Sequence, residues 1–213
     1  MAKVSKFEPV IGLPKFGKIE KDVCGLCQLG KQTKLTHPKV NVVATSRPLE
    51  LLYVDLMGPT RTESMGAKQY IMIVVDDFLR YSWVEFLKRE VGDMRQDGKI
   101  ARGSKMKKGV PIVKIRSEHG KEFENEKFES FCNEHGIKKE FSAPKTLQQN
   151  GVVERKNRVI QELARIMLLN KNIPLKFWAK AVNTLCHIRN RIFFRARTKK
   201  TSYEIWREKK PKV

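Results

Sequence analysis

Three short apolar runs, separated by turn residues, mark the part of the chain that we expect to form a sheet. Residues 51–56, 69–75 and 81–87 read LLYVDL, QYIMIVV and YSWVEFL. This length and this content of β-branched and aromatic side chains are typical of strands. Because the connections between the runs are short, the pattern predicts three strands in an antiparallel meander. A fourth run, PIVKIR at 111–116, predicts another strand.

The spacing of apolar residues changes to a helical period in the second half of the chain. Residues 125–135 place two phenylalanines and a cysteine at i, i+3 and i+4, and residues 151–170 carry a long apolar stripe. The predicted elements here are a helix at 125–135, a short edge strand at 137–141, the long helix at 151–170, a helix at 177–191, a basic loop at 195–200 and a short basic tail from Thr201. Residues 91–109 fit neither period and predict a loop or a poorly formed helix. Together these elements predict an α/β fold.

Composition limits the class of protein. A chain of 213 residues with 40% hydrophobic and 31% charged residues is typical of a soluble globular protein with one core of ordinary size. No apolar run approaches the roughly 18 residues of a membrane span, and the N-terminus lacks the apolar core of a secretory signal. We therefore expect a cytoplasmic or nuclear location and no membrane partner. The cysteines are then expected to be thiols or metal ligands rather than disulfides.

The formal charge of +21 points to a polyanionic partner. The surplus is uneven, since residues 152–213 hold 17 Lys and Arg against 4 Asp and Glu. Such a surplus is self-repelling unless an anion shares it, so nucleic acid is the expected partner. The alternatives are a basic protein that is merely soluble or one that contacts acidic membranes. The candidate phosphate contacts are Lys145, Arg155, Lys156, Arg158 and Arg165, and such contacts position DNA without reading its sequence.

Two sets of residues have the character of metal ligands. Cys24 and Cys27 form a CxxC pair, but a structural Zn²⁺ needs four ligands and only His37 is near, so Zn²⁺ is not expected in this chain. Asp55, Glu118 and Glu154 are predicted at the ends of two strands and in the first turns of the long helix. Carboxylates from separate segments are what two Mg²⁺ or Mn²⁺ ions need to act on a phosphodiester. An acid at a strand end is also commonly a simple turn residue, and this is our interpretation of Asp76 and Asp77.

Several motifs resemble one family in its own order along the chain. They span about 180 of the 213 residues and include CGLCQLGKQTK, LLYVDLMGP, IRSEHGKEFEN and QQNGVVERKNR. The chain resembles the integrase region of copia-type LTR retrotransposon polyproteins. That resemblance implies a ribonuclease-H-like mixed sheet flanked by helices, with a triad of two Asp and one Glu that binds Mg²⁺ and joins element DNA to target DNA. Asp55 and Glu154 match the first and third positions of the triad.

The chain departs from the family pattern at the second acid, where Glu118 replaces Asp. The extra methylene displaces the carboxylate by roughly 1.5 Å, and a misplacement on the order of 1 Å can reduce a rate about 100-fold. We therefore expect impaired catalysis. The apolar pattern of the family's helix at 91–109 is also lost, and the family's second pair of zinc ligands would lie upstream of Cys24.

The expected organisation is a basic arm (1–23), a remnant of a zinc site with its linker (24–46), an integrase catalytic core (47–200) and a basic tail (201–213). DNA integration needs two ends held together, so an active form is expected to be a homo-multimer. Besides a genomic remnant that never accumulates as folded protein, which the lost pattern at 91–109 favours, two alternative functions remain. A non-catalytic nucleic-acid-binding relic would bind DNA in a salt-dependent way that survives Glu154→Ala, and a metal-dependent nuclease would differ only in its products.

Overall fold

A computed structural model of the protein describes residues 11–12, 45–89, 110–120, 122–142, 147–195 and 198–212, with the backbone alone at 147–150. Four features of the sequence therefore lie outside the described residues. They are most of the basic arm, the Cys24–Cys27 pair, the segment 91–109 and Lys145.

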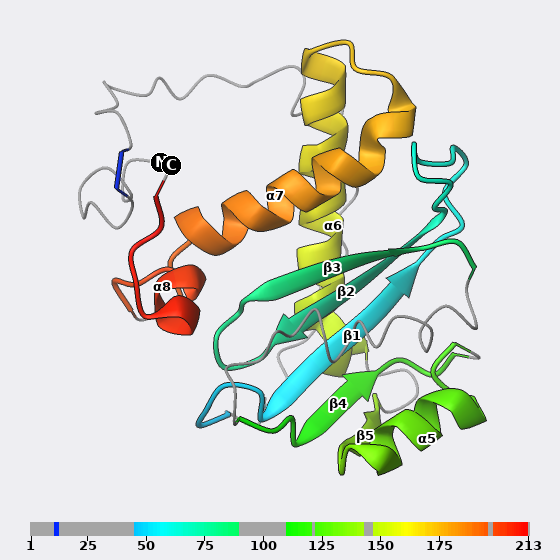
Figure 1. Cartoon of the computed structure of the whole chain (residues 1–213), viewed down its shortest axis with the longest axis vertical. Helices are drawn as coiled ribbons and strands as arrows, with labels where there is room; N and C mark the ends of the chain where they lie inside the picture. Colours follow the sequence, from blue (N-terminus) through cyan, green and yellow to red (C-terminus); the bar gives the residue numbers. More distant parts are fainter. Residues whose placement is uncertain are drawn as a thin grey trace.

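Five strands form one mixed sheet in the order β3-β2-β1-β4-β5 (Figure 1). β1 (Leu51–Met57), β2 (Tyr70–Asp76) and β3 (Ser82–Leu87) are antiparallel neighbours, as the meander predicts. β4 (Lys114–Ser117) and β5 (Lys138–Phe141) add to the other edge of β1 in parallel. The predicted α/β fold with a mixed sheet is confirmed.

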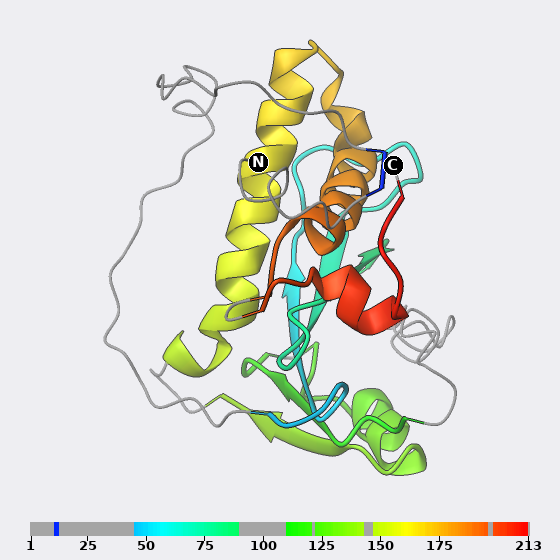
Figure 2. The same ribbon diagram turned by 90° about the vertical axis from the view of Figure 1, so that its left-hand side faces the viewer.

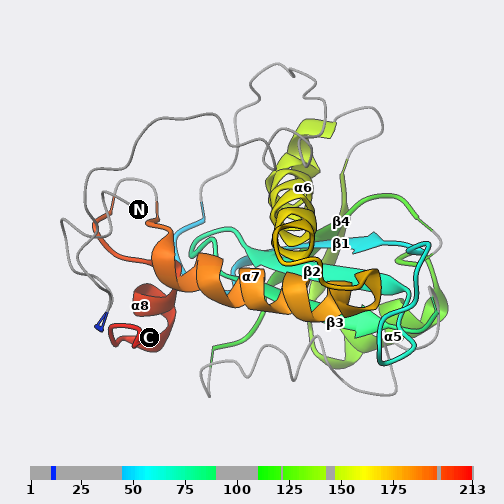
Figure 3. The same cartoon turned by 90° about the horizontal axis from the view of Figure 1, so that it is seen from above.

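Helices cover both faces of this sheet because the strands alternate their apolar side chains. α5 (Glu126–Glu134) packs on the face that carries Leu52 and Val54. α6 (Leu147–Asn170) and α7 (Trp178–Ile192), joined through the short 3₁₀ helix η1 (Leu175–Phe177), pack on the face that carries Leu51 and Tyr53. Figures 2 and 3 show α5 and α6 on opposite sides of the sheet. None of the helices in the described part of the chain is long and apolar enough to cross a bilayer.

The C-terminal segment is helical where a basic tail was predicted. α8 (Ser202–Arg207) begins with a capping box in which Thr201 and Glu204 satisfy each other's backbone N–H groups. Trp206 is buried and lies 5.6 Å, centroid to centroid, from the ring of Trp83. A six-residue helix gains its stability from such packing rather than from its own propensity, so a search for periodicity missed it. α6 likewise begins four residues before the predicted start at 151.

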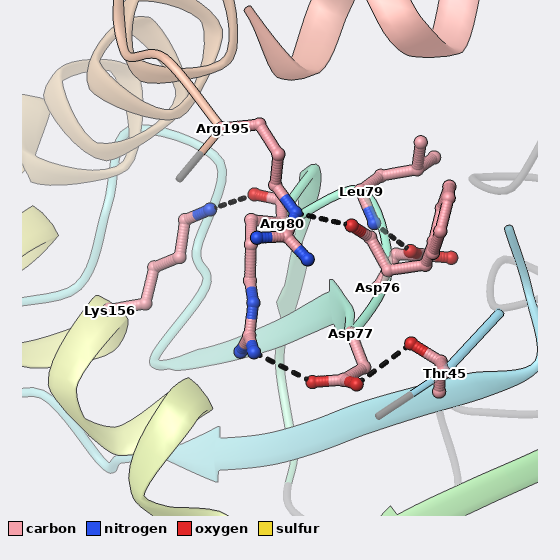
Figure 4. Close-up of polar contacts among 8 residues, drawn as sticks. Thr45, Asp76, Asp77, Leu79, Arg80, Lys156 and Arg195 are labelled. Atoms are coloured by element: carbon pink, nitrogen blue, oxygen red, sulfur yellow. Dashed lines mark hydrogen bonds and ion pairs between the residues drawn. The ribbon is translucent and has the colours of Figure 1, made fainter. Parts of the chain in front are cut away.

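The turn after β2 ties remote segments together (Figure 4). The fully buried Asp76 carboxylate accepts the N–H groups of Leu49 (2.6 Å) and Leu79 (2.5 Å). Asp77 pairs with Arg80 at 3.0 Å and accepts the Thr45 hydroxyl at 2.8 Å. Both aspartates are thus structural, in agreement with our interpretation of them as turn residues.

Two cations from distant helical segments reach the same turn. Lys156 of α6 donates to the Arg80 carbonyl, and Arg195, which follows α7, donates to the Phe78 carbonyl at 2.6 Å (Figure 4). The turn therefore fixes α6 against the antiparallel half of the sheet.

Candidate active site

Asp55 lies near the end of β1 on the face that α6 covers. The alternation of β1 places it on the same side as Tyr53, which is fully buried in the cluster beneath α6 and α7. Asn157 of α6 donates from Nδ2 to Asp55 Oδ2 at 2.6 Å. This contact joins the strand and the helix that supply two of the three predicted acids.

Glu118 follows β4 directly, and β4 is parallel to β1. The pairing of Tyr53 with Arg116 places both strands in one register, and two further residues along each strand bring Glu118 beside Asp55. The ends of adjacent parallel strands meet at one edge of a sheet, which explains how acids 63 positions apart in sequence become neighbours.

Glu154 completes the group from α6. Its neighbour Val153 is fully buried in the helix–sheet core, which fixes the rotation of the helix. Glu154 forms a side-chain hydrogen bond with Glu118, and its Oε1 is buried without a hydrogen-bond partner. The structure thus brings Asp55, Glu118 and Glu154 together, with Glu118 as the carboxylate that the other two share.

Burial and the neighbouring carboxylates raise the pKa values of two of these acids. Burial, followed by the charges of Glu118 and Glu122, raises the pKa of Asp55 to about 6, although the Asn157 hydrogen bond opposes the rise. Burial, then the hydrogen bond and charge of Glu118, then the charge of Asp55, raise the pKa of Glu154 to about 7 against the pull of Arg158. Carboxylates perturbed in this way take up a proton or a cation.

The chemistry of these donors fits a hard divalent cation. Mg²⁺ and Mn²⁺ prefer carboxylate oxygens, and the buried, unpartnered Glu154 Oε1 is an oxygen that a cation would satisfy. Within the described ranges, however, no three His, Cys, Asp or Glu side chains are arranged so that they could already hold a metal ion. The donor types fit, whereas the positions of the side chains would have to change on binding.

The raised pKa of Asp55 predicts that removing its negative charge stabilises the folded chain, by an amount that depends on pH. In the folded chain this pKa rises from an ordinary 3.8 to about 6, so the stabilisation from the protonated carboxyl is complete below about pH 4 and lost as the pH rises through 6. In EDTA at pH 8, Asp55→Asn should therefore raise the free energy of unfolding by about 1 kcal/mol, allowing for solvent screening. Urea titrations at several pH values measure this.

The same titrations contain their own control. At about pH 4 the gain from Asp55→Asn should vanish, because the native carboxyl is then also neutral. Glu134→Gln on the exposed end of α5 should have little effect at either pH. An equal gain at both pH values would show that the effect of Asp55→Asn is not electrostatic.

The predicted phosphate contacts on α6 lie in different environments. Arg155 and Arg165 are exposed, and Arg158 is half-buried beside Glu154. Lys156 instead points inward to the Arg80 carbonyl, and burial, reinforced by Arg189 and Arg80, lowers its pKa to about 7. Its role as a phosphate contact stays a prediction. In this structure its amine holds α6 against the turn after β2.

The polar face of α6 that carries Glu154 and Gln161 borders the sheet. Glu154 turns toward Glu118, and Gln161 Nε2 lies 2.7 Å from the Met57 sulfur of β1. Which polar side chains of a helix meet the strands depends on how the helix rotates against the sheet, which sequence spacing alone does not reveal.

Two residues of the site were missed by the sequence analysis. Asn157 is 2% exposed and orients Asp55, and Glu122 adds negative charge near Asp55. The i, i+3 spacing of Glu154 and Asn157 was the available signal, since it places both on one helix face.

His119, which follows Glu118 directly, is exposed, pairs with Glu124 at 2.6 Å and stacks on Phe141.

The two cysteines that the structure describes are core thiols. Cys132 of α5 and Cys186 of α7 are buried, and burial raises the pKa of each to about 11. Neither is therefore suited to act as a thiolate ligand or nucleophile.

Comparison of the sequence with known proteins identifies a transposon polyprotein as a relative. No family model matches the chain. The retrovirus-related Pol polyprotein of transposon TNT 1-94 from Nicotiana tabacum is 36% identical over 173 residues, which are 79% of this chain and 13% of the polyprotein. The chain thus spans about an eighth of the length of that relative.

Comparison of the fold with solved structures identifies retroviral integrases as structural neighbours of this chain. The simian T-cell lymphotropic virus intasome, solved with the PP2A regulatory subunit B56 gamma, contains a chain that matches with a TM-score of 0.63 at 18% identity, over 85% of this chain and 62% of that one. The HTLV-2 integrase catalytic core with magnesium, in its trimeric form, matches with a TM-score of 0.57 at 22% identity, over 75% of this chain and 97% of that one. The protein is therefore homologous to a retrotransposon Pol polyprotein and has the ribonuclease-H-like fold of retroviral integrase catalytic cores.

Proposed function

We propose that this chain is the catalytic core of a copia-type retrotransposon integrase, which binds DNA and derives from an enzyme that joins DNA strands with the help of Mg²⁺ or Mn²⁺. One observation carries the proposal. Three acids from β1, the end of β4 and α6 converge, and burial and mutual repulsion raise the pKa values of two of them. Carboxylates that converge from separate segments are what a metal-dependent attack on a phosphodiester uses, which supports the proposal.

Each residue of the site has a distinct part in this proposal. Asp55, Glu118 and Glu154 would hold the divalent ions, which when bound stabilise the charge that develops on the attacking and leaving oxygens. Asn157 orients Asp55 through its amide, and without a cation Glu154, whose pKa is raised to about 7, exchanges a proton near neutral pH. The exposed Arg155 and Arg165 would bind the DNA backbone alongside.

The relatives support the partners in this proposal. The HTLV-2 core was solved with magnesium and as a trimer, and the simian virus protein as part of an intasome. We infer for this chain a divalent cofactor, DNA as substrate and a homo-multimeric active form, since joining two DNA ends requires both to be held at once.

A second candidate function is binding of nucleic acid without catalysis. It is favoured by Glu118, which is one methylene longer than the aspartate of the family motif, and by the lack of a preformed metal arrangement in the described residues. A metal-dependent nuclease shares the same acids and would yield cut strands without joined products.

Strand transfer between an element-end duplex and a target duplex tests these candidates. In Mn²⁺, the unmodified chain should give low but measurable joining, whereas Asp55→Asn and Glu154→Gln should abolish it. Glu134→Gln on α5 is the matched carboxylate control and should retain activity. Cut but unjoined products would favour the nuclease, and DNA binding with neither product would favour the non-catalytic relic.

A further inference from the structure

Beside the acids, the sheet carries a row of cations on the side that faces α6. Arg116 pairs across the sheet with Tyr53, whose side chain lies beneath α6, so Arg116 projects from the same face. Strand alternation places Lys114 on this face as well, and the β4–β5 register sets Lys138 beside Lys114. We call Lys114, Arg116 and Lys138 the β4–β5 basic row.

The basic row can be reached from solvent. α6 packs mainly on β1 and β2 rather than on β4 and β5 (Figure 2). Lys138 is exposed, and the side chains of Lys114 and Arg116 are 30% and 13% exposed. Along β4 the row leads directly to Glu118, with side chains on this face spaced roughly 6–7 Å apart.

Glu140 provides an internal anion for this row. A single oxygen, Glu140 Oε2, accepts from Arg116 Nη2 at 2.9 Å, from Arg116 Nε at 3.2 Å and from Lys114 Nζ at 3.3 Å. Burial raises the pKa of Glu140, but the hydrogen bonds and charges of Arg116 and Lys114 outweigh burial and lower it overall. Two cations of the row therefore share one carboxylate, and with Lys138 the group holds three positive charges against one negative charge.

We propose that the β4–β5 basic row binds the phosphate backbone of the DNA strand that enters the acidic site, and that a DNA phosphate displaces Glu140 from Arg116 and Lys114. The planar guanidinium of Arg116 suits an anion with two oxygens, and the two lysines, paired with each other across β4 and β5, add charge beside it. The inference rests on the proposed function, because it assigns a path to the DNA on which that site would act.

Fluorescence anisotropy measures DNA binding over a series of salt concentrations. Because EDTA removes divalent ions, this assay tests the basic row without any catalysis. The double variant Lys114→Gln with Lys138→Gln should weaken binding and reduce the slope of log affinity against log salt by about two, one for each lost phosphate contact. Arg116 is left intact in this test because it also packs over the Tyr53 ring, 5.7 Å from its centroid.

A matched control removes two lysines elsewhere. Lys127 lies exposed on α5, on the opposite face of the sheet, and Lys209 lies exposed after α8. Lys127→Gln with Lys209→Gln loses the same net charge but should leave the slope nearly unchanged. Equal slopes for the two double variants would overturn the proposed row and would leave the proposed function standing.

Glu140→Gln provides a test in the opposite direction. If Glu140 competes with DNA, its neutralisation should tighten binding several-fold, whereas a purely structural ion pair would give unchanged or weaker binding. Melting temperatures confirm that each variant is folded. Failure of the unmodified chain to bind DNA at low salt would overturn both the basic row and the proposed function.

Discussion

Glu118→Asp is expected to raise Mg²⁺-dependent strand transfer about 100-fold, since catalytic geometry is sensitive to displacements on the order of 1 Å. Glu118 reaches Glu154 and shares a hydrogen bond with it, although Glu154 Oε1 stays buried without a partner. An aspartate at this position is shorter by one methylene. It should separate the two groups and leave both free to bind a cation. The assay compares initial rates of joined product.

Two further measurements isolate the cause of that gain. The charge and hydrogen bond of Glu118 help raise the pKa of Glu154 to about 7, so in Glu118→Asp this pKa should move toward its ordinary 4.5, which NMR titration of the carboxyl detects. Glu118→Gln keeps the length but removes the charge, and should not restore activity. A folded Glu118→Asp variant with no gain in rate would mean that the defect lies elsewhere in the chain, for which 91–109 is the first candidate.

Asp76→Ala is expected to reduce the free energy of unfolding by about 3 kcal/mol, because it leaves the N–H groups of Leu49 and Leu79 buried without an acceptor. For a chain of this size, that loss corresponds to a fall in melting temperature of roughly 6–12 °C. Thermal and urea unfolding both measure it. Asp76→Asn keeps one acceptor oxygen, so its free energy of unfolding should lie between those of the unmodified chain and Asp76→Ala.

The control for this prediction lies in the same turn. Arg80 pairs with Asp77 but is partly exposed, with a side-chain accessibility of 34%. Arg80→Ala should therefore cost no more than about 1 kcal/mol, as exposed ion pairs do. If Asp76→Ala were equally mild, water or a shifted backbone would have to satisfy the two N–H groups.

The strands were predictable because their signal is local. β1, β2 and β3 are short apolar runs between turn residues, and each predicted range matches the observed strand within one residue at either end. α8 was not predictable from its own six residues, since its stability depends on contacts between Trp206 and the distant Tyr81 and Trp83.

In the candidate site too, some features were predictable from local sequence and others depended on long-range packing. Asp55, Glu118 and Glu154 were identified from predicted strand ends, a helix start and family motifs, and the structure brings them together. The inward direction of Lys156 and the contact of Asn157 with Asp55 depend on how α6 rotates against the sheet. That rotation is set by packing across more than seventy residues of sequence, which no local pattern records.

The wide separation of the three acids along the chain also governs when the site can exist during synthesis. The antiparallel meander is built from neighbouring segments and can form early, because closing short loops costs little entropy. Asn157 and Asp55 are 102 residues apart, and β4 must pair with β1 before Glu118 lies beside them. A nascent chain that has not yet released α6 therefore carries a nearly complete sheet but no assembled acidic corner, so a capacity to bind divalent ions would be acquired among the last steps of folding.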